Sequence, residues 1–479
     1  MRASGKHTVW IYQLSASARG NMAVNLDVAT RGGEFSMDGY HLDLELGETR
    51  LKGTEVLLSG GTVSGSLGFA PFVPRENKGL AMLPFVLVDS EVDVYMDSLR
   101  FLNLFTSNLG SLLIDGAGQV EGRLHYEKGY LMPGTDLGVG ADNIDVRFKG
   151  LTVGGHGEIA IDVQDRDLNP MTLSIEYEDL AIKRDKDDEP FVVGDSLGIA
   201  INGSNYAAPE AGLSFKELME DEEARARRAT ARMQVDVSSA ALTDLGIIND
   251  YLPPEIPLRI RGGRADLVAD IDSGPGDSEG SVNLSSTDLQ LDYDGQLLEG
   301  KLEANLVLSG GTFSDLAFDF DGSTLVLDEV RVSGERENYD DRGWSAEIDV
   351  ESARAQWQDP PRLNADLAIN ISDTRPVVAV FENQGYRPAW LSRMLTIEDI
   401  EGHATLAMAD KRFTIPEARA EGDKLELGAK GIFTPTDRNG MIYVRYQKLA
   451  ALLKIEGEKN NLDVLKTKEK FENYRVPAL

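Results

Sequence analysis

The chain of 479 residues carries 80 Asp and Glu against 48 Lys and Arg, a formal net charge of −32, and it contains no cysteine. So acidic a chain repels a nucleic-acid backbone, and the lack of cysteine excludes disulfides, zinc–thiolate sites, iron–sulfur clusters and thiol nucleophiles. With 42% hydrophobic residues the composition is that of a folded protein, and the length corresponds to roughly three domains.

The amino-terminal residues lack the apolar core of a signal peptide, and the segment Val9–Leu14 already has the pattern of a strand. A chain that opens inside a sheet pattern is expected to lack its true beginning. No apolar run reaches the length of about eighteen residues that a transmembrane helix needs.

Alternation of apolar and polar residues dominates the chain and predicts strands with one apolar and one charged side. It is clearest in Leu42–Leu46, Val92–Met96, Ile144–Phe148, Ile159–Val163, Leu289–Tyr293 and Leu425–Leu427. Glycine, at 48 residues, is abundant and forms pairs between or beside these runs, as turns and bulges require. The pattern predicts a mainly β fold built as an antiparallel meander.

The sequence also repeats itself. Ala141–Val163 aligns without a gap with Ser286–Leu308, so that Ile144 matches Leu289 and Gly155 matches Gly300. An apolar, helix-like patch precedes the strands in three places, Leu99–Leu109, Leu242–Leu252 and Val377–Leu395. These observations predict a repeated unit of strand, short helix and meander.

We expect four segments along the chain. They are 1–130 as a first β-groove repeat, 131–275 as a second with an inserted helix near 214–233, 276–415 as a third, and 416–479 as terminal strands with a capping helix. The inserted helix is predicted from Phe215–Met233, where acids precede bases, and the last from the helical spacing of Leu449, Leu452 and Leu453. The end of the chain is locally basic, with eight Lys or Arg and five Asp or Glu from Arg445 to Leu479.

Signatures of catalysis and of cofactor binding are absent. The five histidines have no metal-binding spacing, and Gly116–Glu121 lacks the third glycine of a dinucleotide fingerprint. The acid pairs Asp270/Asp272 and Asp319/Asp321 precede glycines but lack the remaining ligands of a calcium loop. We therefore predict a non-enzyme with no catalytic residue, metal or cofactor.

The repeated unit resembles the AsmA-like and TamB-like envelope proteins, including their YdbH-like branch, which belong to the repeating β-groove lipid transporters. The resemblance rests on the unit itself, on Leu245–Pro253 leading into Ile260–Val268, and on the closing Gly422–Gly431. It implies an elongated, taco-like antiparallel sheet that carries phospholipid acyl chains through the Gram-negative periplasm for outer-membrane biogenesis. It also implies an inner-membrane anchor, which these residues do not include, and partner proteins of the inner or outer membrane at the ends.

Alternation alone leaves open whether the apolar face forms an open trough or the sealed core of a sandwich. A groove would make the chain a bridge-like lipid carrier, and a sealed core would favour a structural or adhesive scaffold of the envelope. A carbohydrate-active β-helix enzyme is a third alternative, but no acid pair stands beside exposed aromatic residues. The residues predicted to line a groove are Leu44, Val94, Ile144, Val146, Phe148, Ile161, Leu289, Leu291, Tyr293, Leu306, Leu308, Leu425 and Leu427.

Overall fold

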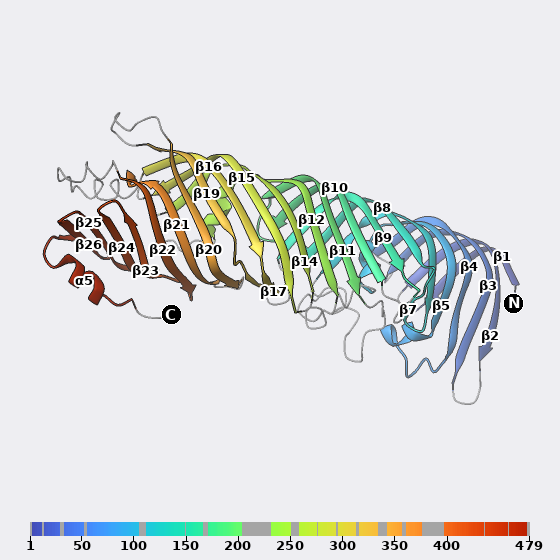
Figure 1. Cartoon of the computed structure of the whole chain (residues 1–479). Coiled ribbons are helices and arrows are strands. Elements are labelled where there is room, and N and C mark those ends of the chain that lie inside the picture. Colours follow the sequence, from blue (N-terminus) through green and yellow to red (C-terminus); the bar gives the residue numbers. More distant parts are fainter. Residues whose placement is uncertain are drawn as a thin grey trace. The chain divides into compact units, whose positions relative to one another are not determined.

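The computed structural model describes residues 2–11, 14–28, 33–51, 55–104, 112–148, 150–165, 171–203, 231–250, 258–274, 276–293, 296–312, 316–333, 343–356, 361–375, 397–434, 436–457 and 459–476. Within these ranges almost every element is a strand, and the predicted mainly β, antiparallel fold is confirmed (Figure 1). None of the helices in these ranges has both the length and the apolar character needed to span a membrane.

The chain divides into two compact units. Unit 1 comprises Met1–Ser239 with Asp272–Pro275, and unit 2 comprises Ala240–Ile271 with Gly276–Leu479. The division into four segments predicted from the sequence stays a prediction.

Unit 1 is an antiparallel meander. Strands β1 to β6 pair in sequence order, β6 then pairs with β8, and β8 to β11 again pair in order. Its elements are β1 (Arg2–Ile11), β2 (Leu14–Val28), β3 (Phe35–Leu51), β4 (Glu55–Phe72), η1 (Gly79–Phe85), β5 (Val86–Met96), η2 (Leu99–Leu104), β6 (Leu113–Glu127), β7 (Tyr130–Leu131), β8 (Asp136–Phe148), β9 (Leu151–Val163), β10 (Met171–Arg184), β11 (Val192–Gly203) and most of β12 (Arg232–Leu242).

Unit 2 continues the same architecture. Strand β15 pairs with β13 and β16, β16 pairs with β19, and β19 to β27 pair in sequence order. Its elements are η3 (Leu245–Asp250), β13 (Leu258–Gly262), β14 (Ala265–Ser273), β15 (Ser278–Tyr293), β16 (Gln296–Leu308), β17 (Gly310–Thr312), β18 (Ala317–Asp319), β19 (Thr324–Ser333), β20 (Trp344–Gln356), β21 (Arg362–Asp373), β22 (Glu398–Ala409), β23 (Arg412–Gly422), β24 (Leu425–Thr434), β25 (Asp437–Tyr446), β26 (Leu449–Glu456), β27 (Lys459–Asp463) and α5 (Thr467–Asn473).

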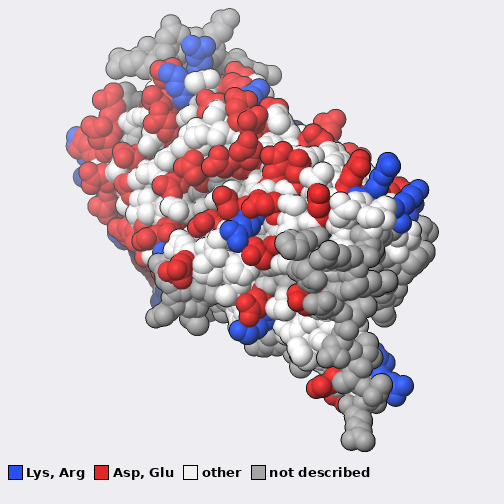
Figure 2. Space-filling model, turned by 90° about the vertical axis from the view of Figure 1, so that its right-hand side faces the viewer, with Lys and Arg blue, Asp and Glu red and all other residues white. Residues whose placement is uncertain are grey.

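Each sheet has an apolar face and a charged face. Where β5 pairs with β6, Val94 lies opposite Val120 on the apolar face, and the next pair, Asp93 with Glu121, lies on the charged face. Figure 1 shows that the strands bend along their length, so that each unit's sheet wraps around one of its faces. The wrapped face is the apolar one, because Val94 and Val120 are buried whereas Asp93 and Glu121 are exposed. Figure 2 shows Asp and Glu spread widely over the surface that it presents, with few Lys and Arg among them.

The repeat seen in the sequence reappears in the strand register. In the β8–β9 hairpin Ile144 pairs with Gly155, and in the β15–β16 hairpin Leu289 pairs with Gly300. Both hairpins shift register at the same place, just after Ala141 in one and just after Ser286 in the other. Because a bulge bends its strand locally, the two hairpins share a bend as well as a pattern.

The predicted helices are only partly correct. The patches at Leu99 and Leu245 form the short 3₁₀ helices η2 and η3, while Val377–Leu395 lies outside the described residues. The inserted helix Phe215–Met233 lies outside them as far as residue 230, and its last two residues begin strand β12.

The helix predicted from Leu449, Leu452 and Leu453 is wrong, since these residues form strand β26. Leu453 packs in the core on the apolar face, whereas Leu452 is buried on the opposite face beneath α5. A strand buried on both sides reads as a continuous apolar run, which periodicity cannot distinguish from a helix. The only described helix of the chain's end is α5, Thr467–Asn473.

An asparagine fastens each of the 3₁₀ helices η2 and η3 to the strand that follows it. The Asn103 side chain donates to the Ile114 carbonyl at 2.7 Å and accepts from the Ile114 amide at 2.9 Å. Asn249 makes the same two bonds with Ile260, at 2.6 Å and 2.9 Å. This pair of hydrogen bonds to one backbone position recurs in both units and ties each helix to the start of the next strand, β6 in unit 1 and β13 in unit 2.

Replacing either asparagine by alanine should destabilise the protein, because it leaves a backbone amide and a carbonyl without partners. We expect a loss of about 3 kcal/mol for Asn103→Ala, whose side chain is fully buried, and about 2 kcal/mol for Asn249→Ala, which water can reach. Urea unfolding followed by circular dichroism measures both. Asn305→Ala, on the exposed charged face, is the control and should change stability by less than about 0.5 kcal/mol; equal effects of all three would contradict the proposed role.

Candidate functional site: the apolar face of the sheet

The residues predicted to line a groove all belong to strands, and the register places them on the apolar face. They are Leu44 on β3, Val94 on β5, Ile144, Val146 and Phe148 on β8, Ile161 on β9, Leu289, Leu291 and Tyr293 on β15, Leu306 and Leu308 on β16, and Leu425 and Leu427 on β24. The side chain of Tyr293 lies outside the described part of the structure. That these residues line a groove stays a prediction.

The predicted lining residues differ in how much water they meet. Ile144, Val146 and Ile161 are 0%, 2% and 1% exposed, so this part of unit 1 is packed like a protein core. By contrast, Leu291, Leu306 and Leu427 of unit 2 are only half-buried. Leu289, Leu308 and Leu425 of unit 2 are buried, and Leu44 and Phe148 of unit 1 are half-buried. The apolar face is therefore closed around Ile144, Val146 and Ile161, and in unit 2 it is open to solvent only in part.

An uninterrupted row of uncharged positions crosses the sheet of unit 2. Direct pairing links Leu284, Ala304, Leu325, Ile348, Ile369, Gly402, Ala420, Leu427, Val444 and Ala451, one on each of ten strands from β15 to β26. Neighbouring strands lie about 4.8 Å apart, so the row extends for roughly 40 Å within this unit. Leu325, Ile348 and Ile369, near its middle, are half-buried.

Unit 1 has an equivalent row. It passes through Gly20, Leu44, Val63, Val92, Gly122, Leu137, Ile161, Leu173 and Ile201, from β2 to β11. In this row Leu44, Val63 and Val92 are half-buried, whereas Leu137, Ile161 and Leu173 are buried. The change from partly open to closed thus falls between β5 and β8.

Leu325, Ile348 and Ile369 were missed as candidate site residues by the sequence prediction. For Ile369 the signal was present, because Leu367–Ile371 has the same pattern as segments that were chosen, whereas Leu325–Leu327 is a continuous apolar run in which periodicity does not distinguish the two sides of the strand. What the sequence could not supply is their partial exposure, which depends on how far the sheet bends.

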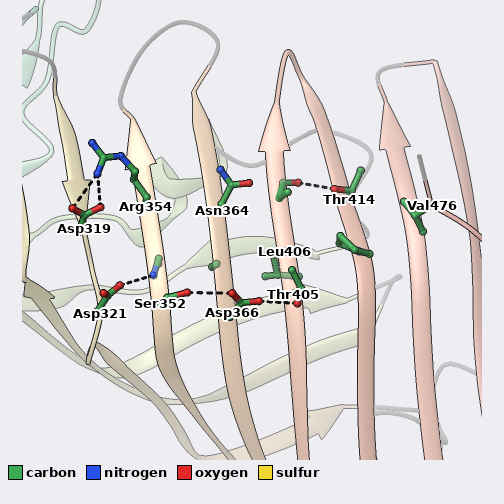
Figure 3. Close-up of a pocket in the computed structure, with 14 residues that line it drawn as sticks. Asp319, Asp321, Ser352, Arg354, Asn364, Asp366, Thr405, Leu406, Thr414 and Val476 are labelled. Carbon is green, nitrogen blue, oxygen red and sulfur yellow. Dashed lines mark hydrogen bonds and ion pairs between the residues drawn. The ribbon is translucent and has the colours of Figure 1, made fainter. Parts of the chain in front are cut away.

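A pocket of about 590 Å³ lies on the charged face of unit 2, across β18 and β20 to β23 (Figure 3). Its carboxylates are engaged by neighbouring groups of the protein. Asp319 accepts two bonds from Arg354, and Asp321 accepts one from the Ala353 amide at 2.8 Å. Asp366 lies between Ser352 and Thr405, at 3.2 Å and 2.7 Å.

These contacts bear on the calcium site considered for Asp319 and Asp321. Both carboxylates serve as cross-strand ties, and no cluster of three or more metal-binding side chains is found among the described residues. The pocket therefore does not by itself indicate a ligand.

The basic end of the chain folds onto the charged face of unit 2. Helix α5 inserts Phe471 against Tyr443, with ring centres 5.5 Å apart, and Lys430 lies 4.8 Å above the Phe471 ring. Gly428 makes room for this ring, since a Cβ there would lie 2.5 Å from Phe471 Cζ. Helix α5 thus covers the charged face of β24 to β26.

Three ion pairs hold α5 in place. Arg419 donates to both Glu472 oxygens, at 2.9 Å and 2.8 Å, and Lys468 donates to Glu426 at 2.8 Å. Lys470 pairs with Asp463. Two of the basic residues expected at this end, Lys468 and Lys470, therefore face partners in the fold.

Comparisons with known proteins identify no relative: no protein-family model matches the chain, and neither the curated proteins nor the solved structures contain a significant match. The resemblance to the AsmA-like and TamB-like proteins stays a prediction.

Aspartate substitutions should distinguish the closed and the partly open regions of the apolar face. Val146→Asp buries a carboxylate with no partner and should cost more than about 3 kcal/mol of folding free energy, whereas Leu291→Asp can turn its charge toward water and should cost less. Ala160→Asp, at an exposed position of the charged face, is the matched control and should change stability little. Urea unfolding measures all three, and equal losses for Val146→Asp and Leu291→Asp would show that the apolar face is as closed at Leu291 as at Val146.

Glu426 should make stability depend on pH. Burial acts to raise the pKa of Glu426, but hydrogen bonds from Lys468 and Arg445 outweigh it and hold the pKa below the ordinary value. A carboxylate of this kind stabilises the fold above the unfolded-state pKa of about 4.3, and this contribution is lost as the pH falls through the lower pKa of the folded state.

Glu426→Gln should therefore lower Tm at pH 7, and the difference from the parent protein should shrink as the pH falls below about 4. Thermal unfolding across this pH range measures it, with Glu279→Gln, at an exposed position, as the control. A Tm difference that stays constant with pH would mean that the carboxylate charge is not what stabilises α5.

Proposed function

We propose that the apolar face of this sheet holds phospholipid acyl chains and that the protein is a bridge-like carrier of lipid between membranes of a bacterial envelope. The observation that carries the proposal is the uninterrupted row from Leu284 to Ala451, whose middle residues are partly open to solvent. An acyl chain binds to an apolar surface that carries no charge. Soluble proteins rarely leave such a surface exposed unless it binds something.

The energetics favour such a ligand. Exposing an acyl chain to water costs about 0.8 kcal/mol per CH₂, so a sixteen-carbon chain loses roughly 12 kcal/mol unless another apolar surface covers it. Side chains such as Leu325 and Ile348 supply that surface, while the headgroup stays in water. Carrying a lipid in this way breaks no bond and requires no catalytic residue.

In this proposal the protein works in the periplasm, anchored at the inner membrane, with partner proteins of the inner or outer membrane at its ends. The acidic charged face supports such a role, since a net charge of −32 keeps an extended sheet from associating with its own copies.

A second candidate function is a non-catalytic scaffold of the envelope. It is favoured by the closed apolar face at β8 and β9, where Ile144 and Ile161 have no room for a ligand beside them. A scaffold requires only that the sheet be stable, so it would not need the partly open row in unit 2.

The decisive experiment combines native mass spectrometry of the purified chain with lipid transfer between donor and acceptor liposomes. We expect phospholipid to co-purify, and Leu325→Asp to lower the transfer rate at least tenfold, because a carboxylate in the row is costly to desolvate against an acyl chain. Asn305→Asp adds the same charge to the charged face of the neighbouring strand β16 and should leave the rate unchanged. A purified protein without lipid whose Leu325→Asp variant matches the parent would favour the scaffold.

A further inference from the structure

Large apolar side chains are exposed at one rim of unit 2. Leu449, Val464 and Leu465 are 48%, 58% and 72% exposed, and they are three of the five such side chains found exposed across the described ranges. Val464 and Leu465 are adjacent, in the link between β27 and α5.

The strand register brings these residues together. Asp463, the last residue of β27, pairs with Leu452, so the link that follows runs back toward Leu449 at the start of β26. The Gln447 amide donates to the Lys424 carbonyl at 2.7 Å, which places the turn before β24 beside the turn before β26. We call Asp423–Lys424, Gln447–Leu449 and Val464–Lys466 together the C-terminal rim.

Positive charge surrounds the apolar residues of the rim. Lys424, Lys448 and Lys466 are exposed there, the first with Asp423 at 3.2 Å and the last with Glu469 at 3.3 Å. The rim itself holds these three lysines and one acid, Asp423, although the whole chain carries −32. An anionic surface repels most of this protein, so the C-terminal rim is where such a surface can approach.

We propose that the C-terminal rim binds the interface of an anionic lipid bilayer. Leu449, Val464 and Leu465 enter the boundary between headgroups and acyl chains, and Lys424, Lys448 and Lys466 lie among the phosphates. Apolar side chains at the centre and lysines around them are the arrangement that interfacial binding requires. This binding goes beyond the proposed function and does not depend on it, because a scaffold could dock in the same way.

The test is co-sedimentation of the full chain with liposomes of phosphatidylethanolamine and phosphatidylglycerol, compared with liposomes of phosphatidylcholine alone. We expect binding to the anionic liposomes only, weakening as salt is raised. Val464→Ser with Leu465→Ser should reduce the binding constant more than tenfold, because two apolar side chains are lost from the interface. Lys448→Gln should reduce it about fivefold, as expected for one lysine near an anionic surface.

Matched controls come from unit 2. Val268→Ser removes an apolar side chain that is 47% exposed outside the rim, and Lys411→Gln removes an exposed lysine from the turn between β22 and β23; both should bind as the parent does. Unchanged Tm in all variants confirms that the fold is intact.

Three results would overturn the proposal: no binding of the parent to anionic liposomes, binding by the Val464/Leu465 variant equal to the parent's, or self-association that this variant abolishes without any liposome binding. The last result would assign the rim to contact with a second copy of the chain. The two proposals can also fail separately. If the Val464/Leu465 variant loses liposome binding but still co-purifies with lipid, membrane binding by the rim and lipid binding by the apolar face are distinct properties.

Discussion

The fold depends on one constraint: every strand has an apolar side that must be covered, and the described residues supply no second sheet to cover it. Bending of the sheet buries much of the apolar face, because it brings the apolar side chains of the strands toward one another. Where this is complete, as at Ile144 and Ile161, the result is an ordinary packed core. Where it is incomplete, as at Leu325 and Ile348, apolar surface meets water, and a ligand that covered it would complete the burial.

The sequence predicts the strands well because alternation is a local property. Ile144 and Val146 repeat at Leu289 and Leu291, and the structure places both pairs on the apolar face with the same register shift nearby. The candidate lining residues could be chosen from this pattern, since a residue's side of a strand follows from counting by two. The short helices at Leu99 and Leu245 were also foreseeable as apolar patches, but their 3₁₀ form and their asparagine ties were not.

What the sequence could not predict depends on contacts between distant segments. Leu452 and Leu453 face opposite sides of β26: Leu453 is buried in the core on the apolar face, and Leu452 is buried on the charged face because α5 returns to cover it. Nothing local pairs Gly428 with Phe471, which lie more than forty residues apart, yet the ring fits only where that side chain is missing. The degree of opening of the apolar face is a property of the same kind. Leu291 and Val146 look alike in the alternation, yet Leu291 is half-buried and Val146 is 2% exposed, because burial depends on the side chains that other strands bring near.

The charged face obeys a complementary rule. Over most of its area acids meet water, and cross-strand pairs such as Lys301 with Glu329 lessen the repulsion at little gain in stability. Where α5 covers the face, the carboxylate of Glu426 lies beneath the helix. It accepts hydrogen bonds from Lys468 of the helix and from Arg445 of the neighbouring strand. Covering a carboxylate without such partners would carry the full cost of removing a charge from water. Any macromolecule that covers more of this face must therefore bring basic groups of its own, whereas the apolar face can accept only a ligand that brings none. The two sides of one strand thus select opposite kinds of partner.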